Sequence, residues 1–399
     1  MQSVSGAPGL SASSASEPIR VMVVDDSAVV RGLVTRMLEE DPHVQVVASV
    51  GNGQMAINAL ERYDIEVVIL DIEMPVMDGL TALPLLLKID PHLQVIMAST
   101  LTLKNADISL RALERGAADY IPKPTTSREL SGGVDFKTHL IEKVNALAAV
   151  RRRYPRRLAK AEPSIAPRPS VVPRPAAPVE AEAGAPARTA VYHRQTQPLV
   201  LRPGATETPD VIAIGSSTGG PQALFSVLSA LKAGSLRQPI LITQHMPPTF
   251  TTILAEHIAR ISGWPAAEAQ DGQVVASNHI YIAPGDFHMV VESRGSEKIL
   301  RLNKNPPENF CRPSVDPMLR SVAAAWGRRV LVVILTGMGS DGLKGGRAVV
   351  EAGGSIIAQD EASSVVWGMP GAVATAGLCS AVVPLNEIPQ HIMRIAARH

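Results

Sequence analysis

Residues 211–220, VIAIGSSTGG, decide the fold of the C-terminal half of the chain. The apolar run at 211–214 predicts a buried strand, and the glycines after it let the backbone turn sharply into a helix. The pattern G-x-S-x-G at 215–219 is typical of a turn that presents its central serine, here Ser217, above a sheet. A strand, a tight turn and a helix together favour a parallel α/β sheet.

Two other strands of this half also end in reactive side chains. ILITQ is followed directly by His245, and VVIL is followed by the glycine-rich TGMGSDG, which contains Asp341. Because parallel strands present their C-terminal ends at one edge of a sheet, we expect Ser217, His245 and Asp341 to meet there. These residue types can serve as nucleophile, base and orienting acid, so the pattern predicts a hydrolase.

Each of the three residues also has an ordinary structural explanation. Glycine-rich turns bind phosphates through backbone N–H groups, a lone histidine is more often structural, and an aspartate in a loop can cap a helix. Three strand ends carrying the three required residue types favour the catalytic interpretation. The order Ser, His, Asp differs from the Ser, acid, His order of the α/β-hydrolase superfamily, which argues against membership in it.

The length and composition restrict the class of protein. A chain of 399 residues fits two domains with connecting segments, and 46% hydrophobic with 19% charged residues is typical of a globular protein. The net charge of +1 gives no bias toward nucleic acid or membrane surfaces. Cys311 and Cys379 have no metal-ligand spacing, and no apolar run approaches the ~20 residues that span a bilayer. We therefore expect a cytoplasmic protein with no direct membrane insertion.

Changes in composition divide the chain into four segments. We expect a disordered tail at 1–18, an α/β domain at 19–148, a proline-rich linker at 149–208 and a second α/β domain at 209–399. The first domain has five strand-like runs alternating with helical segments, which predicts a doubly wound parallel sheet. In the second, the alternating stretch 279–303 predicts an antiparallel hairpin added to a mainly parallel sheet. The basic cluster RRRYPRR at 151–157 is interpreted as a solvated helix end, with a docking patch as the alternative.

Carboxylates gather at the predicted strand ends of the first domain. Asp25 and Asp26 follow the strand VMVV, and Asp71 ends the strand VVIL. Three clustered carboxylates need a cation, and Mg²⁺ suits carboxylates together with phosphate oxygens. Lys123 and Ser99 lie at neighbouring strand ends, where they can contact a phosphoryl group on Asp71. The alternative, that Asp25 or Asp26 only caps the next helix, does not explain the combination.

The motifs DD, LDIEMPVMDG, a hydroxyl residue and KP together resemble a two-component receiver domain with the flavodoxin-like fold. The resemblance implies that Asp71 is phosphorylated by a partner histidine kinase. It further implies that Mg²⁺ is held by Asp25, Asp26, Asp71 and the backbone carbonyl of Glu73. Tyr120 matches the aromatic position that often changes rotamer on activation, although a buried tyrosine without such a role fits equally well.

The motifs IAIGSSTGGP, ITQHMPP, YIAPGD, RPSVD, ILTGMGSDG and AQDEASSVVWGMP resemble those of bacterial chemotaxis protein-glutamate methylesterases, the CheB family, over roughly residues 210–385. The resemblance implies demethylation of glutamate γ-methyl esters on methyl-accepting chemoreceptors, deamidation of receptor glutamines, and no cofactor at the esterase site. It points to the Met338 backbone as an oxyanion donor, and the turn geometry offers Thr218. Two positions depart from the family pattern: Ser216, where alanine is frequent, and Ser340, where asparagine is common.

Two other classes of function fit less well. A nucleotide-binding module would not need His245 or Asp341, and the chain lacks the acidic residue of a dinucleotide fingerprint. A DNA-binding regulator would need a helix-turn-helix or a strongly basic face, so we expect no nucleic acid partner. We expect the N-terminal domain to dock over the Ser217 edge of the second sheet and to repress it until Asp71 is phosphorylated.

Overall fold

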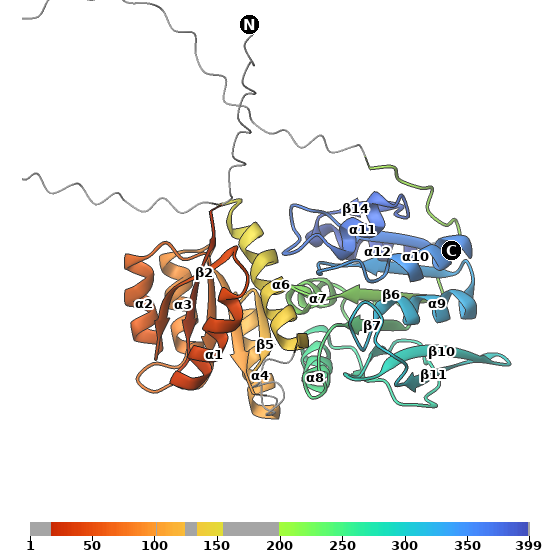
Figure 1. Cartoon of the computed structure of the whole chain (residues 1–399). Coiled ribbons are helices and arrows are strands. Elements are labelled where there is room, and N and C mark those ends of the chain that lie inside the picture. The colour runs from red at the N-terminus through yellow and green to blue at the C-terminus, as the bar shows by residue number, and fades with distance from the viewer. Residues whose placement is uncertain (1–16, 101, 124–133, 155–198, 398–399) are drawn as a thin grey trace, which may run out of the picture.

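The computed structural model describes residues 17–100, 102–123, 134–154 and 199–397, which form two α/β domains side by side (Figure 1). Of the expected tail at 1–18, only residues 17 and 18 are described. Most of the expected linker at 149–208, residues 155–198, also lies outside the described residues. Within the described part of the chain, no helix is long and apolar enough to cross a membrane.

The N-terminal domain contains a five-stranded parallel sheet in the order β2-β1-β3-β4-β5, which confirms the predicted doubly wound fold. Its strands are β1 (Ile19–Val24), β2 (Val44–Val50), β3 (Val67–Asp71), β4 (Gln94–Ser99) and β5 (Asp119–Pro122). Its helices are α1 (Ala28–Glu39), α2 (Gly53–Arg62), α3 (Gly79–Ile89), α4 (Leu103–Glu114) and α6 (Val134–Arg151). The strands are rich in Val and Ile because helices cover both faces of the sheet.

Side-chain caps begin the helices directly after the strands. Ser27 caps α1 by accepting a hydrogen bond from the Val30 amide, so neither Asp25 nor Asp26 is the cap of this helix. Asn52, Asp78 and Thr102 begin the next helices in the same way. Asp25 and Asp26 remain at the strand end and are available for another role.

The C-terminal domain contains a seven-stranded parallel sheet in the order β14-β13-β12-β6-β7-β9-β8. Its strands are β6 (Val211–Ser216), β7 (Ile240–Gln244), β8 (Ala266–Glu268), β9 (Ile280–Ile282), β12 (Val330–Ile334), β13 (Ser355–Gln359) and β14 (Ala381–Val383). The helices are α7 (Gly220–Ala230), α8 (Phe250–Ser262), α9 (Val315–Trp326), α10 (Leu343–Glu351), α11 (Met369–Thr375) and α12 (Ile388–Ala396), with a 3₁₀ turn, η1 (Leu385–Glu387).

The expected antiparallel hairpin is present as β10 (His288–Arg294) and β11 (Glu297–Asn303). Its strands pair with each other and form a two-stranded sheet of their own. The first part of the stretch 279–303 forms β9, which pairs in parallel with β7 and β8. The three-residue strands β8 and β14 at the two edges of the large sheet were not predicted.

The two domains meet through α4 and β5 on one side and α7 and α8 on the other (Figure 1). The ring of Tyr120 in β5 stacks on Phe250 at the start of α8. Next to them, His257 of α8 is hydrogen-bonded to the Glu114 carboxylate at the end of α4. The amide of Gln222 donates a hydrogen bond to the Ala117 carbonyl at 2.6 Å. The contact is therefore both apolar and polar.

The interpretation of the basic cluster as a solvated helix end is wrong for Arg151, whereas Arg152 and Arg153 are exposed as expected. Arg151 is buried and lies 2.7 Å from the Asp90 carboxylate, where α6 closes on its own domain. Arg153 forms an ion pair with Glu361 of the C-terminal domain at 3.3 Å. A buried cation needs a partner, and that partner is distant in the sequence.

Candidate active site

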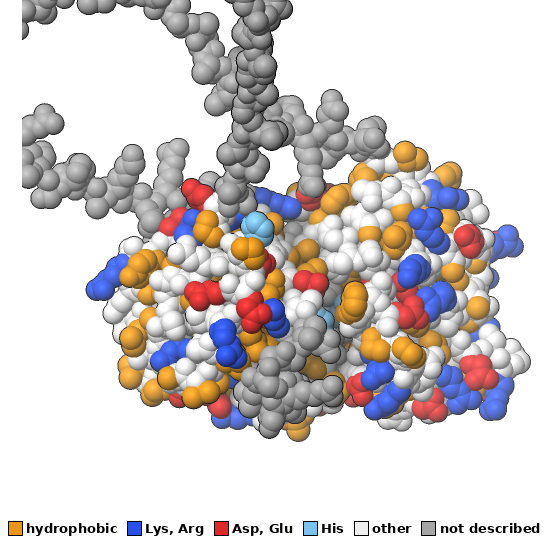
Figure 2. Space-filling view, in the orientation of Figure 1, with side chains coloured by type: hydrophobic (Ala, Val, Ile, Leu, Met, Phe, Trp, Pro, Cys, Tyr) orange, Lys and Arg blue, Asp and Glu red, His pale blue; other side chains and the backbone are white. Residues whose placement is uncertain are grey.

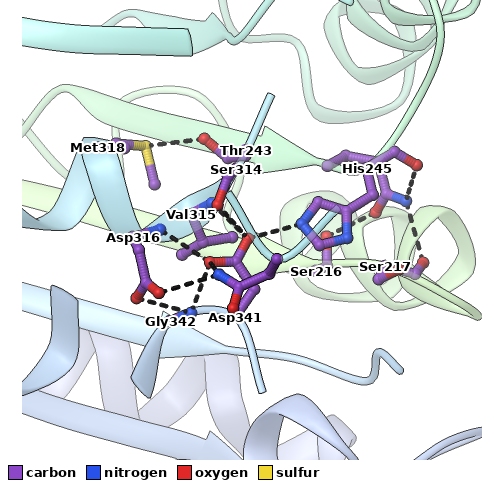
Figure 3. Close-up of polar contacts among 12 residues, drawn as sticks. Ser216, Ser217, Thr243, His245, Ser314, Val315, Asp316, Met318, Asp341 and Gly342 are labelled. Carbon is purple, nitrogen blue, oxygen red and sulfur yellow. Dashed lines mark hydrogen bonds and ion pairs between the residues drawn. The ribbon is translucent and has the colours of Figure 1, made fainter. Parts of the chain in front are cut away.

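Strand order brings the three predicted catalytic residues together at one edge of the C-terminal sheet. The central strand β6 pairs with β7 on one side and with β12 on the other. Ser216 lies opposite Gln244 in this register, so Ser217 and His245 leave the sheet from neighbouring strand ends. Asp341 reaches the same edge from the loop after β12, and its carboxylate contacts the His245 ring (Figure 3).

The Asp341 carboxylate accepts six hydrogen bonds. Its Oδ2 atom accepts from His245 Nε2 at 2.7 Å and from the Ser314 hydroxyl at 2.8 Å. The remaining donors are the Val315 amide to Oδ2 and, to Oδ1, the amides of Asp316 and Gly342 and the side chain of Asn309. Burial alone would raise the pKa of Asp341, but His245 and the backbone N–H groups outweigh it and lower the pKa to about 2. The carboxylate is therefore ionised and fixed in orientation.

Two helix N-termini surround this carboxylate and its neighbour. The Asp341 carboxylate lies against the N-terminus of α9, whose first amides, those of residues 315 and 316, donate hydrogen bonds to it. Asp316, in the first turn of α9, accepts hydrogen bonds from the amides of Gly342 and Gly345 at the start of α10. Each aspartate thus caps the other's helix (Figure 3). Burial, together with the charge of Asp341, raises the pKa of Asp316.

The contact with Asp341 assigns different roles to the two nitrogens of His245. Nε2 faces the carboxylate and carries the proton in the neutral ring, which leaves the lone pair on Nδ1. The side chain is 11% exposed. Burial lowers the pKa of His245, but the neighbouring Cys311 thiol and the Asp341 carboxylate raise it above the ordinary value. Asp341 thus stabilises the imidazolium that forms when the ring takes up a proton.

The two adjacent serines of the turn have different surroundings. Ser216 is fully buried, and its hydroxyl donates to the Gln244 side chain at 2.7 Å. The amide of Gln244 in turn donates to the backbone carbonyls of Ser217 and His245. Ser217 is half-buried, and among the described residues its hydroxyl has no hydrogen-bond partner, including His245. Ser216 holds the turn together, and Ser217 has the accessible hydroxyl.

The expected oxyanion donors lie where two loops approach each other closely. A Cβ atom on Gly337 would come within 3.0 Å of the Ser217 amide nitrogen, so only glycine allows this approach. Met338 directly follows Gly337, and Thr218 directly follows Ser217. Within the described residues, neither the Met338 nor the Thr218 amide donates a hydrogen bond. Two N–H groups beside the serine are therefore available for a ligand.

Four residues of this site were not predicted from the sequence. They all position other groups: Gln244, Asn309, Ser314 and Asp316. Ser314 and Asp316 belong to RPSVD, a motif that marked the family resemblance but offered no role for its residues. Gln244 precedes His245 on a mainly apolar strand, and this polar residue at a buried strand end was a usable signal.

The predicted carboxylate cluster of the N-terminal domain is present. Carboxylate oxygens of Asp25, Asp26 and Asp71 lie within 4.8 Å of one another, a donor set that fits a hard cation such as Mg²⁺. Lys123 Nζ lies 2.6 Å from Asp25 and 2.7 Å from Asp71. Burial raises the pKa of Asp71 to about 6; Lys123 opposes this shift and the Asp25 charge adds to it.

The remaining predicted residues of this domain lie around the cluster. Ser99 ends β4 beside Asp71 on β3, and its buried hydroxyl accepts from Ser109 at 3.0 Å. Glu73 is exposed, and its side chain pairs with Lys104. Tyr120 is buried against the C-terminal domain.

Comparisons with known proteins agree with this arrangement. The family model of the CheB methylesterase matches residues 212–392, and that of the response regulator receiver domain matches residues 21–135. A protein-glutamate methylesterase/protein-glutamine glutaminase of Paramagnetospirillum magneticum is 66% identical, with 97% of this chain and 99% of that protein aligned. The chain belongs to the CheB family.

A second relative, a protein-glutamate methylesterase/protein-glutamine glutaminase of Rhodospirillum rubrum, is 64% identical over 95% of each chain. The crystal structure of the Thermotoga maritima CheB methylesterase catalytic domain is 38% identical, covers 47% of this chain and 100% of its own, and has a TM-score of 0.46. As a member of the CheB family the chain is a hydrolase, a protein-glutamate methylesterase/glutaminase with a receiver domain. The predictions of its fold class and enzyme class are confirmed.

Proposed function

We propose that the catalytic domain hydrolyses glutamate γ-methyl esters of chemoreceptors through Ser217, His245 and Asp341. The main support for this proposal is the 2.7 Å contact between His245 Nε2 and the Asp341 carboxylate, which accepts six hydrogen bonds in all. This contact leaves Nδ1 as the basic atom of the ring. His245 directly follows β7, which pairs with β6, the strand that leads to Ser217. An acid that fixes the tautomer, a base and an accessible hydroxyl are the parts that acyl transfer requires.

In the proposed reaction, His245 Nδ1 takes the Ser217 proton as Oγ attacks the ester carbonyl. The tetrahedral intermediate collapses when the imidazolium gives its proton to the leaving methoxide, which departs as methanol. Water then attacks the acyl-enzyme, with His245 again as base, and releases glutamate. The same steps on a receptor glutamine release ammonia, which accounts for a deamidase activity at one site.

The free Met338 and Thr218 amides support an oxyanion site. Preorganised N–H donors stabilise charge as it develops on the carbonyl oxygen, and loss of one such donor costs roughly 10²–10³ in kcat. Within the part of the chain that the structure describes, these amides make no competing hydrogen bond. We assign them as the donors because Thr218 directly follows Ser217 and Met338 directly follows Gly337, which closely approaches Ser217.

We further propose that phosphorylation of Asp71 by a chemotaxis histidine kinase controls the esterase. Asp25, Asp26, Asp71 and the Glu73 carbonyl would hold Mg²⁺, which supplies charge neutralisation for the incoming phosphoryl group. Lys123, within 2.7 Å of Asp71, would pair with a phosphoryl oxygen, and Ser99 would bond another. A cytoplasmic location stays a prediction that fits these partners.

The contact between the domains supports control by docking. The receiver helix α6 leads to Arg153, which pairs with Glu361, and Val365 of the same loop packs against the turn at Gly219. The receiver therefore contacts a segment that borders the nucleophile turn. In this proposal the docked receiver limits access of a receptor helix, and phosphorylation favours a receiver state that docks less well.

The nucleophile is tested by comparing Ser217→Ala with Ser216→Ala. Methanol release from methyl-labelled receptor should fall by several orders of magnitude in Ser217→Ala. Ser216→Ala leaves the Gln244 oxygen without its buried donor, so we expect lower stability, by about 1–3 kcal/mol, with turnover largely retained in the folded fraction. Equal losses of turnover at both serines, or a loss only at Ser216, would overturn the assignment.

A further inference from the structure

A tight turn at residues 308–311 lies beside the catalytic centre. Glu308 and Cys311 exchange backbone hydrogen bonds of 3.2 and 2.9 Å, which leaves Asn309 and Phe310 as the two central residues. Both have left-handed backbone, with φ of 52° and 62°. Such turns prefer Asn and Gly at both positions, so Asn309 fits well and a bulky phenylalanine is an outlier.

Nothing in the described part of the chain packs on the Phe310 ring. The side chain is 89% exposed, the highest value among the exposed large hydrophobic residues of the described chain. Folding therefore gains neither burial nor favourable backbone geometry from this residue. Strained residues persist where the surroundings impose them, and they concentrate at functional sites.

The surroundings of the turn hold it firmly. The Glu308 carboxylate accepts two hydrogen bonds from the Arg320 guanidinium of α9. The Asn309 side chain donates to Asp341 at 2.8 Å and to Asp316 at 3.0 Å. Cys311 neighbours the His245 ring. Phe310 thus lies between two residues that each contact a member of the triad, and its ring is exposed to solvent.

We infer that Phe310 is a substrate-recognition residue whose ring packs against an apolar side chain of the receptor helix, about one turn from the target glutamate. The inference rests on the proposed function. Residues three and four positions apart on a helix share one face, so a helix presenting its ester to Ser217 also presents neighbouring side chains to this rim. A rigid aromatic side chain fixed by its backbone loses little entropy when it binds.

The ring offers nothing to an isolated ester that lacks these neighbouring residues. Phe310 should therefore raise kcat/KM for a receptor helix relative to kcat/KM for a small glutamyl methyl ester. Aromatic anchors at interfaces commonly account for tenfold or more in affinity. The expected signature of its loss is a fall in this ratio, since reaction with the small ester depends only on the triad and the oxyanion amides.

The test uses the full chain, treated with a small-molecule phosphodonor. We would measure kcat/KM for a methyl-esterified receptor signalling fragment and for blocked glutamate γ-methyl ester. Phe310→Asn removes the ring and suits left-handed backbone, and Phe310→Tyr keeps an aromatic ring. Tyr63→Ala is the matched control, because it truncates an exposed aromatic side chain at the end of α2, far from the esterase edge (Figure 1).

We expect Phe310→Asn to lower the receptor-to-small-ester ratio about tenfold or more, with an unchanged or higher melting temperature. Phe310→Tyr and Tyr63→Ala should keep the wild-type ratio. A wild-type ratio in Phe310→Asn would overturn the inference. A parallel loss of melting temperature and of both activities would also overturn it, because that result indicates a structural role. A change in oligomeric state alone would overturn it as well, because that result indicates contact between copies of the chain. Wild-type protein that cleaves neither substrate would instead overturn the proposed function itself.

Discussion

The Tyr120 ring of the receiver lies on the Phe250 ring of the catalytic domain, with centroids 4.5 Å apart and ring planes 11° apart. Tyr120 precedes Lys123 by three residues, and Lys123 contacts the Asp71 carboxylate. Phe250 begins the helix that follows His245 by five residues. One stacked pair therefore links the pocket of the proposed phosphorylation site to the segment that carries the proposed catalytic base. Figure 2 shows the surfaces of the two domains in contact, and the stacked rings themselves are buried beneath this surface.

Replacing Tyr120 with leucine should weaken this contact while preserving apolar volume. An aromatic pair contributes about 0.5–1.5 kcal/mol beyond its buried area, which corresponds to roughly a two- to tenfold shift toward the undocked state. We expect the unphosphorylated full chain to become faster by about that factor and to respond less to phosphodonor. Methanol release with and without phosphodonor measures both effects. Tyr63→Leu on the distant face is the control. An unchanged basal rate would remove the stack from the mechanism.

Asp341→Asn should lower turnover by roughly 10³–10⁴ in a folded protein, because the amide favours the wrong imidazole tautomer and cannot stabilise the imidazolium. Thermal melting of the same sample checks the folding. Near-normal turnover in the folded variant would exclude Asp341 from the triad.

The residual activity of Asp341→Asn should also have a shifted pH profile. The carboxylate raises the pKa of His245 because it stabilises the charged ring, so removing the charge lowers this pKa. In the proposed mechanism His245 acts as a base in its neutral form, so kcat/KM should rise as pH passes upward through its pKa. The rising limb should therefore move to lower pH in the variant. A limb at the wild-type position would show that another group titrates.

The acidic pocket predicts a linked effect of Mg²⁺ and pH on the stability of the receiver. The pKa of Asp71 in the folded protein, about 6, lies above its ordinary value of 3.8. The folded chain therefore binds more protons than the unfolded chain between these values, and this contribution to stability is lost as pH rises through about 6. Asp71→Asn should remove this pH dependence and melt at or above the wild-type temperature at pH 7 without Mg²⁺.

Added Mg²⁺ should raise the melting temperature of the wild type and have little effect on Asp71→Asn. Glu73→Gln is a suitable control: it changes only the side chain and keeps the backbone carbonyl assigned to the metal, so it should respond like the wild type. A strong Mg²⁺ response in Asp71→Asn would contradict the proposed ligand set.

The sequence predicted the elements that local patterns specify. Ser217 and His245 could be predicted from the sequence because each follows an apolar strand at the point where the strand pattern stops. The carboxylate cluster could be predicted for the same reason, since Asp25 and Asp71 lie at the ends of neighbouring parallel strands. Strand ends are local features, and a parallel sheet gathers them at one edge.

Contacts between segments that are distant in the sequence could not be predicted from local patterns. Four of the six donors that hold Asp341 come from residues 309–316, and nothing in the spacing of RPSVD specifies a partner 25–27 positions away. Arg151 looked like part of a solvated basic run, yet it is buried against Asp90, 61 positions earlier. The strands β8 and β14 are only three residues long, too short to show a period of two.

Control of the esterase by the receiver is tested most directly by initial rates of methanol release from methyl-labelled receptor, measured on the full chain before and after addition of phosphodonor. Ser217→Ala supplies the background rate, and Asp71→Asn is the matched control. We predict at least about tenfold faster release after phosphorylation and no response in Asp71→Asn. A tenfold change corresponds to a difference of about 1.4 kcal/mol between the docking free energies of the phosphorylated and unphosphorylated receiver. Equal rates before and after phosphorylation of the wild type, with Asp71 phosphorylation verified, would contradict repression by the receiver.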